Sequence, residues 1–419
     1  MLPILGKKKR KKTDVAEINP EEILVAIDVG TRYIKAVLFK ATSQSEITIV
    51  GYARRAQKYG AMRDAMIVNL QQVIEAVDSC VGRAIEVAEK SQGEIALPSK
   101  AVIGIAGELV KGVSILAGYE REDADQKISE VELDEVLLQV QEQAFAGAVE
   151  EIAKEVGMEP QQIEEIQSRI DRTEIDGVVV NNPLGFTGQE VSYRVFSTFA
   201  PRLHVNSLRE LAESLGLEQS KVVVQPYAVA RAIKEVQQNN AGAIIVDMGG
   251  GTTDVALIDK GGVLGTKMFA FGGDVLTKRL AEFYKLEMQT AEDLKLDYSD
   301  QKIAEKQSKE IHSLLEQDLK IWVEGLQIAI EELLEDEDGD ISNLPPQMYL
   351  CGGGATLAEV REVCLQHPWT ASLPFEKFPK INYLFPNQLQ NVTDETRLLI
   401  DPSDVTPAAI ARMLIDRGF

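Results

Sequence analysis

The chain has 419 residues, of which 45% are hydrophobic and 26% are charged, and its formal net charge is −22 at pH 7. This length exceeds one ordinary domain and suits two to four, and the apolar fraction is ample for large buried cores. The acidic balance excludes broad nucleic-acid binding, because a phosphate backbone would be repelled over most of the surface. We therefore expect no nucleic-acid partner.

The three cysteines and three histidines are scattered along the chain without ligand spacing. This pattern excludes a disulfide framework and a zinc cluster, and it fits a reducing cytosol. No apolar run approaches the ~18 residues that a membrane span needs. The opening MLPIL precedes the basic run KKKRKK, whereas a signal peptide has its charges first. The sequence therefore predicts an intracellular protein.

The first elements along the chain are a tail, a hairpin and a helix. Residues 1–19 show no periodicity and predict a basic N-terminal tail. The apolar run at 23–28 predicts a buried strand, and a second run at 34–39 follows a tight turn, so the two predict a hairpin. Apolar residues between Ile67 and Ala88 recur at steps of three and four, which predicts an amphipathic helix.

The pattern changes near residue 99. Strand-like sequence punctuated by glycine is followed by a capping box at 129–132, which opens a helical stretch to about residue 156. Two further strand-like runs follow, joined by a turn rich in Gly, Asn and Pro. The segment 99–200 is therefore predicted as a strand–helix–strand–strand insert.

Later elements alternate strands with helices. The segment 243–259 predicts a buried strand, a glycine loop and a second strand, and residues 274–330 are mostly helical by period. The acidic run at 331–340 predicts a solvated loop. A strand at 347–351 enters another glycine loop, and the segment 406–419 closes the chain as a short helix.

The most specific motif is D-M-G-G-G-T-T-D, placed between two apolar runs. Glycines allow the backbone to approach an anion without obstruction by Cβ, and the free N–H groups of such a turn form an anion-binding nest. Threonine hydroxyls add donors. Three glycines alone are as often a plain hairpin turn, but the acids at both ends favour a phosphate loop. The candidate residues are Asp247, Gly249, Gly250, Gly251, Thr252 and Thr253.

An earlier segment, D-V-G-T-R-Y-I-K, repeats this design. Its candidates are Asp28, Gly30, Thr31, Arg32 and Lys35. Two such hairpins, facing each other, can hold a polyphosphate between two lobes. Asp28 and Asp247 would repel phosphates unless a cation lay between, for which Mg²⁺ with several waters is the simplest choice. For Lys35, a phosphate contact and a solvated strand position remain equally open.

A third glycine loop follows the strand QMYLC. Gly352, Gly353 and Gly354 let the backbone lie close to a flat ring or a ribose. Taken alone, this loop is more often a simple turn between a strand and a helix. Its position after the two phosphate-type loops makes it more specific.

In this order, the three segments resemble the two phosphate motifs and the adenosine motif of the actin-like ATPase superfamily. The resemblance covers about 22–419 and implies an α/β fold of two lobes with mixed sheets, and ATP with Mg²⁺ in the cleft. Within the superfamily, the chain most resembles FtsA, the bacterial division family that links FtsZ filaments to the membrane. The insert lies where that family carries its extra subdomain.

The resemblance divides the chain into six parts. They are a tail (1–19), a first lobe (20–98 and 201–232), the insert (99–200), a second lobe (233–287 and 321–400), a small upper subdomain (288–320) and a terminal helix returning to the first lobe (401–419).

Three more site residues follow from the resemblance. The superfamily places a Glu and a Lys near the adenosine, and the matching residues here are Glu292 and Lys295, for which an exposed helical ion pair is the alternative. Related ATPases orient the attacking water with an acid or amide before a proline, which matches Gln225. A glutamine can orient water but cannot take its proton, so we expect slow hydrolysis, with ATP acting mainly as a structural switch.

The FtsA resemblance also implies partners and a location. We expect self-association into filaments, binding of the FtsZ C-terminal tail, and a place in the cytoplasm at the inner face of the membrane at the division site. FtsA proteins commonly have a C-terminal amphipathic helix, but here the apolar and basic residues 1–12 predict attachment to an anionic membrane surface, with a disordered basic tail as the alternative. A PilM-like pilus-assembly scaffold is the alternative function, and a small-molecule kinase on the same fold is less favoured.

Overall fold

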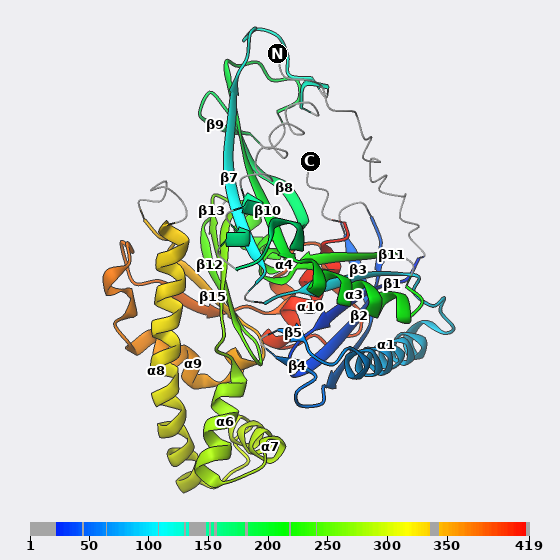
Figure 1. Cartoon of the computed structure of the whole chain (residues 1–419), viewed down its shortest axis with the longest axis vertical. Helices are drawn as coiled ribbons and strands as arrows, with labels where there is room; N and C mark the ends of the chain where they lie inside the picture. The colour runs from blue at the N-terminus through cyan, green and yellow to red at the C-terminus, as the bar shows by residue number, and fades with distance from the viewer. Residues whose placement is uncertain are drawn as a thin grey trace.

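The computed structural model describes residues 22–415 except 44–45, 64, 108, 130, 134–147, 151, 155–156, 181–182, 218, 240 and 336–342. The predicted tail, most of the predicted insert helix and the second half of the predicted acidic loop lie outside the described residues. The first half of that loop, 331–335, is instead the end of a helix that begins at Glu305. Two sheets form the centres of two lobes, and a slender extension rises from them (Figure 1).

The first lobe is built on a six-stranded sheet in the order β11-β6-β1-β2-β3-β17. Its strands are β1 (Leu24–Val29), β2 (Tyr33–Ala41), β3 (Ile47–Ala56), β6 (Lys100–Ile105), β11 (Gln219–Val224) and β17 (Val392–Asp394). A short hairpin of β4 (Met62–Arg63) and β5 (Met66–Ile67) follows β3. All six residues of β1 are buried, as expected of a central strand that is covered on both faces.

Helices cover this sheet on both sides. They are α1 (Leu70–Gln92), α3 (Arg202–Ser214), α4 (Gln225–Ala232), α5 (Lys234–Asn239) and α10 (Val405–Arg412). Asn69 starts α1, accepting a 3.1 Å hydrogen bond from the N–H of Gln72. Helix α4 contacts β11 of this sheet and β12 to β14 of the second, so it lies between the lobes with α10 beside it.

The second lobe is built on a nine-stranded sheet in the order β16-β15-β12-β13-β14-β7-β10-β8-β9. Its strands are β7 (Lys111–Glu120), β8 (Ile163–Ile175), β9 (Val178–Val180), β10 (Glu190–Pro201), β12 (Ala243–Met248), β13 (Thr253–Asp259), β14 (Gly262–Phe269), β15 (Gln347–Cys351) and β16 (Lys380–Tyr383). Its helices are α6 (Gly273–Tyr284), α7 (Met288–Ser299), α8 (Glu305–Glu335) and α9 (Ala358–Gln366). Helices α6 and α7 form the lower end in Figure 1.

The insert is joined to both lobes, and its start differs from the boundary at residue 99 predicted from the sequence. Strand β6, predicted as its beginning, lies in the first-lobe sheet because it pairs in parallel with β1 and β11. Strand β7 then meets β14 at Gly112 and Thr266, so the insert continues the second-lobe sheet. A Cβ on Gly112 would come within 2.5 Å of both the Phe196 ring and Thr266 Oγ1, so only glycine fits at this junction.

Three other boundaries also differ from the sequence-based ones. Strand β17, within the segment predicted as second lobe, pairs with β3 of the first lobe. Helix α8 runs without a break across the boundary at residue 320. Helix α10 is buried among first-lobe strands, as placed by the resemblance, but it ends at Arg412.

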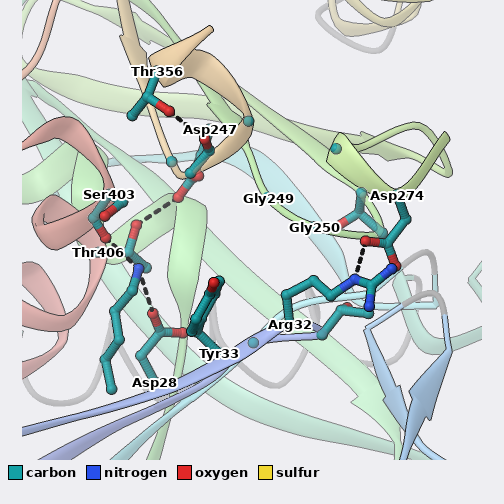
Figure 2. A pocket seen from close by; sticks show the side chains of 18 of the residues that line it. Asp28, Arg32, Tyr33, Asp247, Gly249, Gly250, Asp274, Thr356, Ser403 and Thr406 are labelled. Atoms are coloured by element: carbon teal, nitrogen blue, oxygen red, sulfur yellow. Dashed lines mark hydrogen bonds and ion pairs between the residues drawn. The ribbon is translucent and has the colours of Figure 1, made fainter. Parts of the chain in front are cut away.

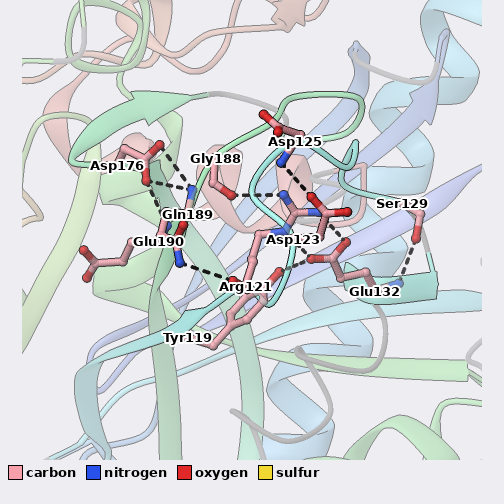
Figure 3. A network of polar contacts seen from close by, with 10 residues as sticks. All are labelled: Tyr119, Arg121, Asp123, Asp125, Ser129, Glu132, Asp176, Gly188, Gln189 and Glu190. Carbon is pink, nitrogen blue, oxygen red and sulfur yellow. Dashed lines mark hydrogen bonds and ion pairs between the residues drawn. The ribbon is translucent and has the colours of Figure 1, made fainter.

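A polar network holds the far end of the insert together (Figure 3). Arg121, buried at the end of β7, pairs with Glu132 through Nε and Oε1 at 2.7 Å, and its NH1 group donates to the carbonyl of Gly188 at 3.0 Å. Asp176, in the turn after β8, accepts from the N–H of Gln189 at 3.0 Å. These bonds link three separate turns at the tip of the insert.

Within the described ranges, no helix combines the length and apolar character needed to cross a bilayer.

Candidate functional site

A cavity of about 370 Å³ opens between the two lobes (Figure 2). It brings together predicted residues from all three glycine-rich motifs and from α4 and α7. The predicted residues that line it are Asp28, Gly30, Thr31, Arg32, Lys35, Gln225, Asp247, Gly249, Gly250, Thr252, Glu292, Lys295, Gly352, Gly353 and Gly354. Gly251 and Thr253 do not line it.

The turns of the two hairpins touch at the cavity floor. A Cβ on Gly250 would come within 2.7 Å of Arg32 Cγ, and a Cβ on Gly251 would lie 3.0 Å from Thr31 Oγ1. Both glycines are therefore needed for the first-lobe turn to approach the second-lobe turn. Gly251 serves this contact rather than the cavity wall.

Thr253 supports the loop from behind. Its fully buried hydroxyl donates to the carbonyl of Phe271 at 2.6 Å and accepts from the Trp322 indole N–H at 2.9 Å. The side chain thus fixes the second turn against α8 and is not available to a ligand in this arrangement.

A buried cluster of acids lies at one end of the cavity, where β1, β12 and β13 meet. Asp28, Asp247 and Asp254 are all buried, and Lys35 Nζ lies 3.7 Å from Asp28 Oδ2. Burial, opposed by Lys35 and reinforced by Asp247, raises the pKa of Asp28 to about 6. Burial also raises the pKa of Asp247, and burial together with both other acids raises that of Asp254 well above its usual range. The ionised forms of these three acids are therefore disfavoured in the folded chain, and a bound cation would favour them.

The C-terminal segment completes this end of the cavity. Lys35 Nζ donates to the carbonyl of Ser403, and Thr406 Oγ1 donates to Asp247 Oδ2 at 2.5 Å. The N–H of Gly352 donates to the carbonyl of Pro402 at 3.1 Å. A segment of about five residues thus touches both lobes beneath the pocket.

At the other end, Glu292 and Lys295 form a buried ion pair on α7 with Nζ and Oε2 2.9 Å apart. Lys295 also donates to the Gly273 carbonyl at 2.9 Å and to Thr277 Oγ1 at 2.7 Å. Burial opposes ionisation of Glu292, but Lys295 and the Thr277 hydroxyl outweigh it and lower the pKa of Glu292. The pair is buried and lines the cavity, which the exposed-pair alternative does not explain.

Gln225 is the first residue of α4, directly after β11. Its Nε2 donates to Asp28 Oδ1 at 3.1 Å, so the amide is held at the acid cluster. Gln225 therefore lines the cavity beside the acid cluster.

Several lining residues were not selected from the sequence. They are Tyr33, Arg54, Asp254, Gly273, Asp274, Ser299, Asp300, Thr356, Asp401, Ser403 and Thr406. Asp254 is the last residue of the D-M-G-G-G-T-T-D motif that the sequence did single out, so its place in that motif was a usable signal. Ser403 and Thr406 carry no local signal, because only tertiary packing brings them to the cavity.

The donor set fits a hydrated cation better than a fully protein-bound one. No group of three or more His, Cys, Asp or Glu within the described residues is arranged to hold a metal by itself. The buried acid cluster nevertheless supplies carboxyl oxygens beside two glycine turns that can face phosphates. Mg²⁺ keeps several waters and commonly uses one or two carboxylates plus phosphate oxygens, which this arrangement suits.

Sequence comparison gives matches to cell division protein FtsA. Residues 244–384 match the family model described as cell division protein FtsA. The chain is 22% identical over 281 residues to cell division protein FtsA of Neisseria meningitidis, covering 66% of this chain and 62% of that protein. It is 25% identical over 357 residues to the Streptococcus pneumoniae protein of the same name, covering 82% of this chain and 73% of that one. The match thus spans less than two thirds of the N. meningitidis relative.

Structure comparison gives the fold. A chain from a solved PilM–PilN type IV pilus biogenesis complex superposes with a TM-score of 0.63 at 15% identity, covering 95% of this chain and all of that one. The arrangement of the two lobes and the insert therefore has a counterpart among solved structures. The chain is therefore similar in sequence to cell division protein FtsA, and it has the fold of the chain in the PilM–PilN complex.

Proposed function

We propose that the cavity binds ATP together with Mg²⁺. The observation that carries this proposal is the meeting of the Gly30–Thr31 and Gly249–Gly251 turns beside a buried cluster of three acids. The actin-like fold generally binds a nucleotide with a divalent metal, which supports it. The turns would hold the phosphates, Asp28 and Asp247 would hold the hydrated cation, and the 352–354 loop with Glu292 and Lys295 would face the adenosine.

The cellular role that the relatives support best is bacterial cell division. We propose that the chain polymerises and links FtsZ filaments to the inner face of the membrane. The FtsA match of residues 244–384 supports this role. Residues 1–12, with MLPIL and KKKRKK, are the proposed membrane attachment, and Gln225 is the proposed water-orienting residue of a slow ATPase.

The fold likeness to the PilM–PilN structure supports one alternative, a pilus-assembly scaffold. A pull-down separates the two: the full chain is incubated with immobilised FtsZ C-terminal peptide or with cytoplasmic peptides of pilus membrane proteins. Retention by the FtsZ peptide supports the division role. Retention by a pilus peptide alone would replace it.

A further inference from the structure

An ion pair joins the two lobes across the mouth of the cavity. Arg32, in the turn between β1 and β2 of the first lobe, contacts Asp274, in the first turn of α6 of the second lobe, through Nε and Oδ1 (Figure 2). The Arg32 side chain is 12% exposed and that of Asp274 is 25% exposed, and both line the cavity. We call this contact the interlobe pair.

The surroundings of Asp274 keep its carboxylate next to the glycine turn. The N–H of Asp274 donates to the carbonyl of Gly250 at 2.7 Å, and the N–H of Gly273 donates to that of Gly249 at 3.0 Å. The negative carboxylate therefore occupies the edge of the region where a polyanion would lie. A carboxylate at this position repels an anionic ligand, unless the ligand takes Arg32 away from Asp274 or a cation offsets the charge of the ligand.

Arg32 retains an unused hydrogen-bonding group. Its NH2 nitrogen is buried and has no hydrogen-bond partner within the described residues. The guanidinium also lies 4.9 Å from the centre of the Tyr59 ring, which holds the side chain over the first-lobe surface. An arginine with a free donor beside two glycine turns is well placed to bind a phosphate in a forked arrangement.

We propose that Arg32 exchanges partners: it binds Asp274 when the cavity lacks a polyphosphate and turns its guanidinium to the phosphates when one is bound. This rests on the proposed nucleotide site and adds its regulation. The exchange makes the interlobe pair a competitor of the ligand, so Asp274 weakens nucleotide binding while holding the empty lobes together. The ion pair then holds the lobes together when the cavity is empty, and the nucleotide holds them together when it is bound.

Two single substitutions have opposite predicted effects on binding. Asp274→Asn removes the competing charge with little change of shape, and we expect ATP–Mg²⁺ to bind about tenfold more tightly, within the usual range of coupling between sites. Arg32→Gln removes the phosphate partner and should weaken binding by a similar factor. Both should increase the radius of gyration of the nucleotide-free full chain in small-angle scattering, because both break the interlobe pair.

A matched control is Asp318→Asn. This change breaks another Arg–Asp contact of the second lobe, in which Arg279 Nε donates to Asp318 Oδ2 at 2.8 Å away from the cavity. It should alter neither affinity nor radius of gyration. Circular dichroism checks that each variant is folded, and titration calorimetry measures affinity.

The outcomes are distinct. Tighter binding in Asp274→Asn that disappears when Arg32→Gln is added, with expansion of the empty chain in both single variants, supports the exchange. Unchanged or weaker binding in Asp274→Asn, or no expansion, overturns it. Failure of the parent chain to bind ATP–Mg²⁺ overturns the proposed nucleotide function and the exchange together, whatever the scattering shows.

Discussion

Gly352 lies directly against Asp247. The backbone of Gly352 has a φ of +86°, and a Cβ there would come within 2.2 Å of Asp247 Oδ1. The glycine loop after β15 therefore packs onto the acid at the end of β12, and these two strands are parallel neighbours in the sheet. Any side chain at position 352 would clash with Asp247 of the acid cluster. The third glycine motif therefore shapes the end of the cavity where this cluster lies, as well as the part of the wall that the motif itself forms.

Removing one buried acid should make the empty protein more stable. Burial and the two neighbouring acids raise the pKa of Asp254 well above its ordinary value near 3.8, so the folded chain holds this proton more tightly than the unfolded chain does. As the pH rises above about 4, Asp254 ionises in the unfolded chain before it does so in the folded chain, so the free energy of unfolding falls. We expect Asp254→Asn to raise the free energy of unfolding at pH 8.5 by about 1–3 kcal/mol, the usual cost of an unsatisfied buried polar group.

Urea unfolding in EDTA without nucleotide measures this effect, and the gain should be smaller at pH 6. The exposed Asp78→Asn is the control and should change little at either pH. An equal gain at both pH values, or a loss of stability, would show that the folded chain does not disfavour ionisation of Asp254.

Hydrolysis of ATP should be slow. Gln225 can align a water but cannot accept its proton, and its amide is already bonded to Asp28. We expect turnover below the ordinary enzyme range of about 1 to 1000 per second. Phosphate release by the full chain measures it, with Gln225→Ala expected to be slower still. A rate well inside that range, lost in Gln225→Ala, would instead make Gln225 part of an efficient catalytic site.

Self-association should depend on the tip of the insert. Val131, Val178 and Phe186 are exposed apolar side chains close to the Arg121 network, and β9 is the edge strand of the nine-stranded sheet. Deletion of the whole predicted insert would remove β6 from the first-lobe sheet, so point changes are the sharper test. We expect Val178→Lys with Phe186→Lys to abolish sedimentable polymer while leaving ATP binding intact.

The control for this test is Val68→Lys, which adds a charge at an equally exposed valine of the first lobe. It should sediment like the parent chain. Polymer of unchanged yield in the tip variant would place the contact between subunits elsewhere.

Membrane attachment should depend on residues 1–12. Each Lys or Arg near an anionic leaflet contributes about 1 kcal/mol, so the six-residue basic run gives at most roughly 6 kcal/mol, and burial of MLPIL adds to it. The full chain should sediment with anionic vesicles at low salt and be released by high salt, whereas a version lacking residues 1–12 should not bind. Equal binding by both would assign attachment to another segment.

The parts of this structure that the sequence predicts are those encoded locally. The β1–β2 and β12–β13 hairpins follow from apolar runs around a glycine turn, and these turns bring Gly30 and Gly250 to the cavity as expected. The features that the sequence does not predict depend on which of the two sheets a strand joins. Strand β6 has the same glycine-punctuated pattern as β7, yet the two lie in different sheets.

Local sequence patterns likewise could not predict polar contacts between residues that lie far apart in the chain. Thr406 reaches Asp247, and Arg32 reaches Asp274, only because the folded lobes and the C-terminal segment converge. Thr253 shows the reverse case. Its motif predicted a ligand contact, but its hydroxyl is hydrogen-bonded to the Trp322 indole and to the Phe271 carbonyl. Local spacing identifies a loop, while packing decides which of its hydroxyl groups remain free.

Calorimetric titration of ATP into the full chain, with and without Mg²⁺, tests the central claim most directly. We expect saturable one-site binding with Mg²⁺, much weaker binding with EDTA, and stabilisation of about 2.7 kcal/mol at a ligand concentration one hundred times Kd. Gly250→Val should abolish binding, because even a Cβ there would lie 2.7 Å from Arg32 Cγ, whereas Gly82→Ala, where nothing lies within 4 Å, should bind like the parent. Equal affinity in the parent and Gly250→Val, or no binding by the parent, would contradict a nucleotide site between these turns.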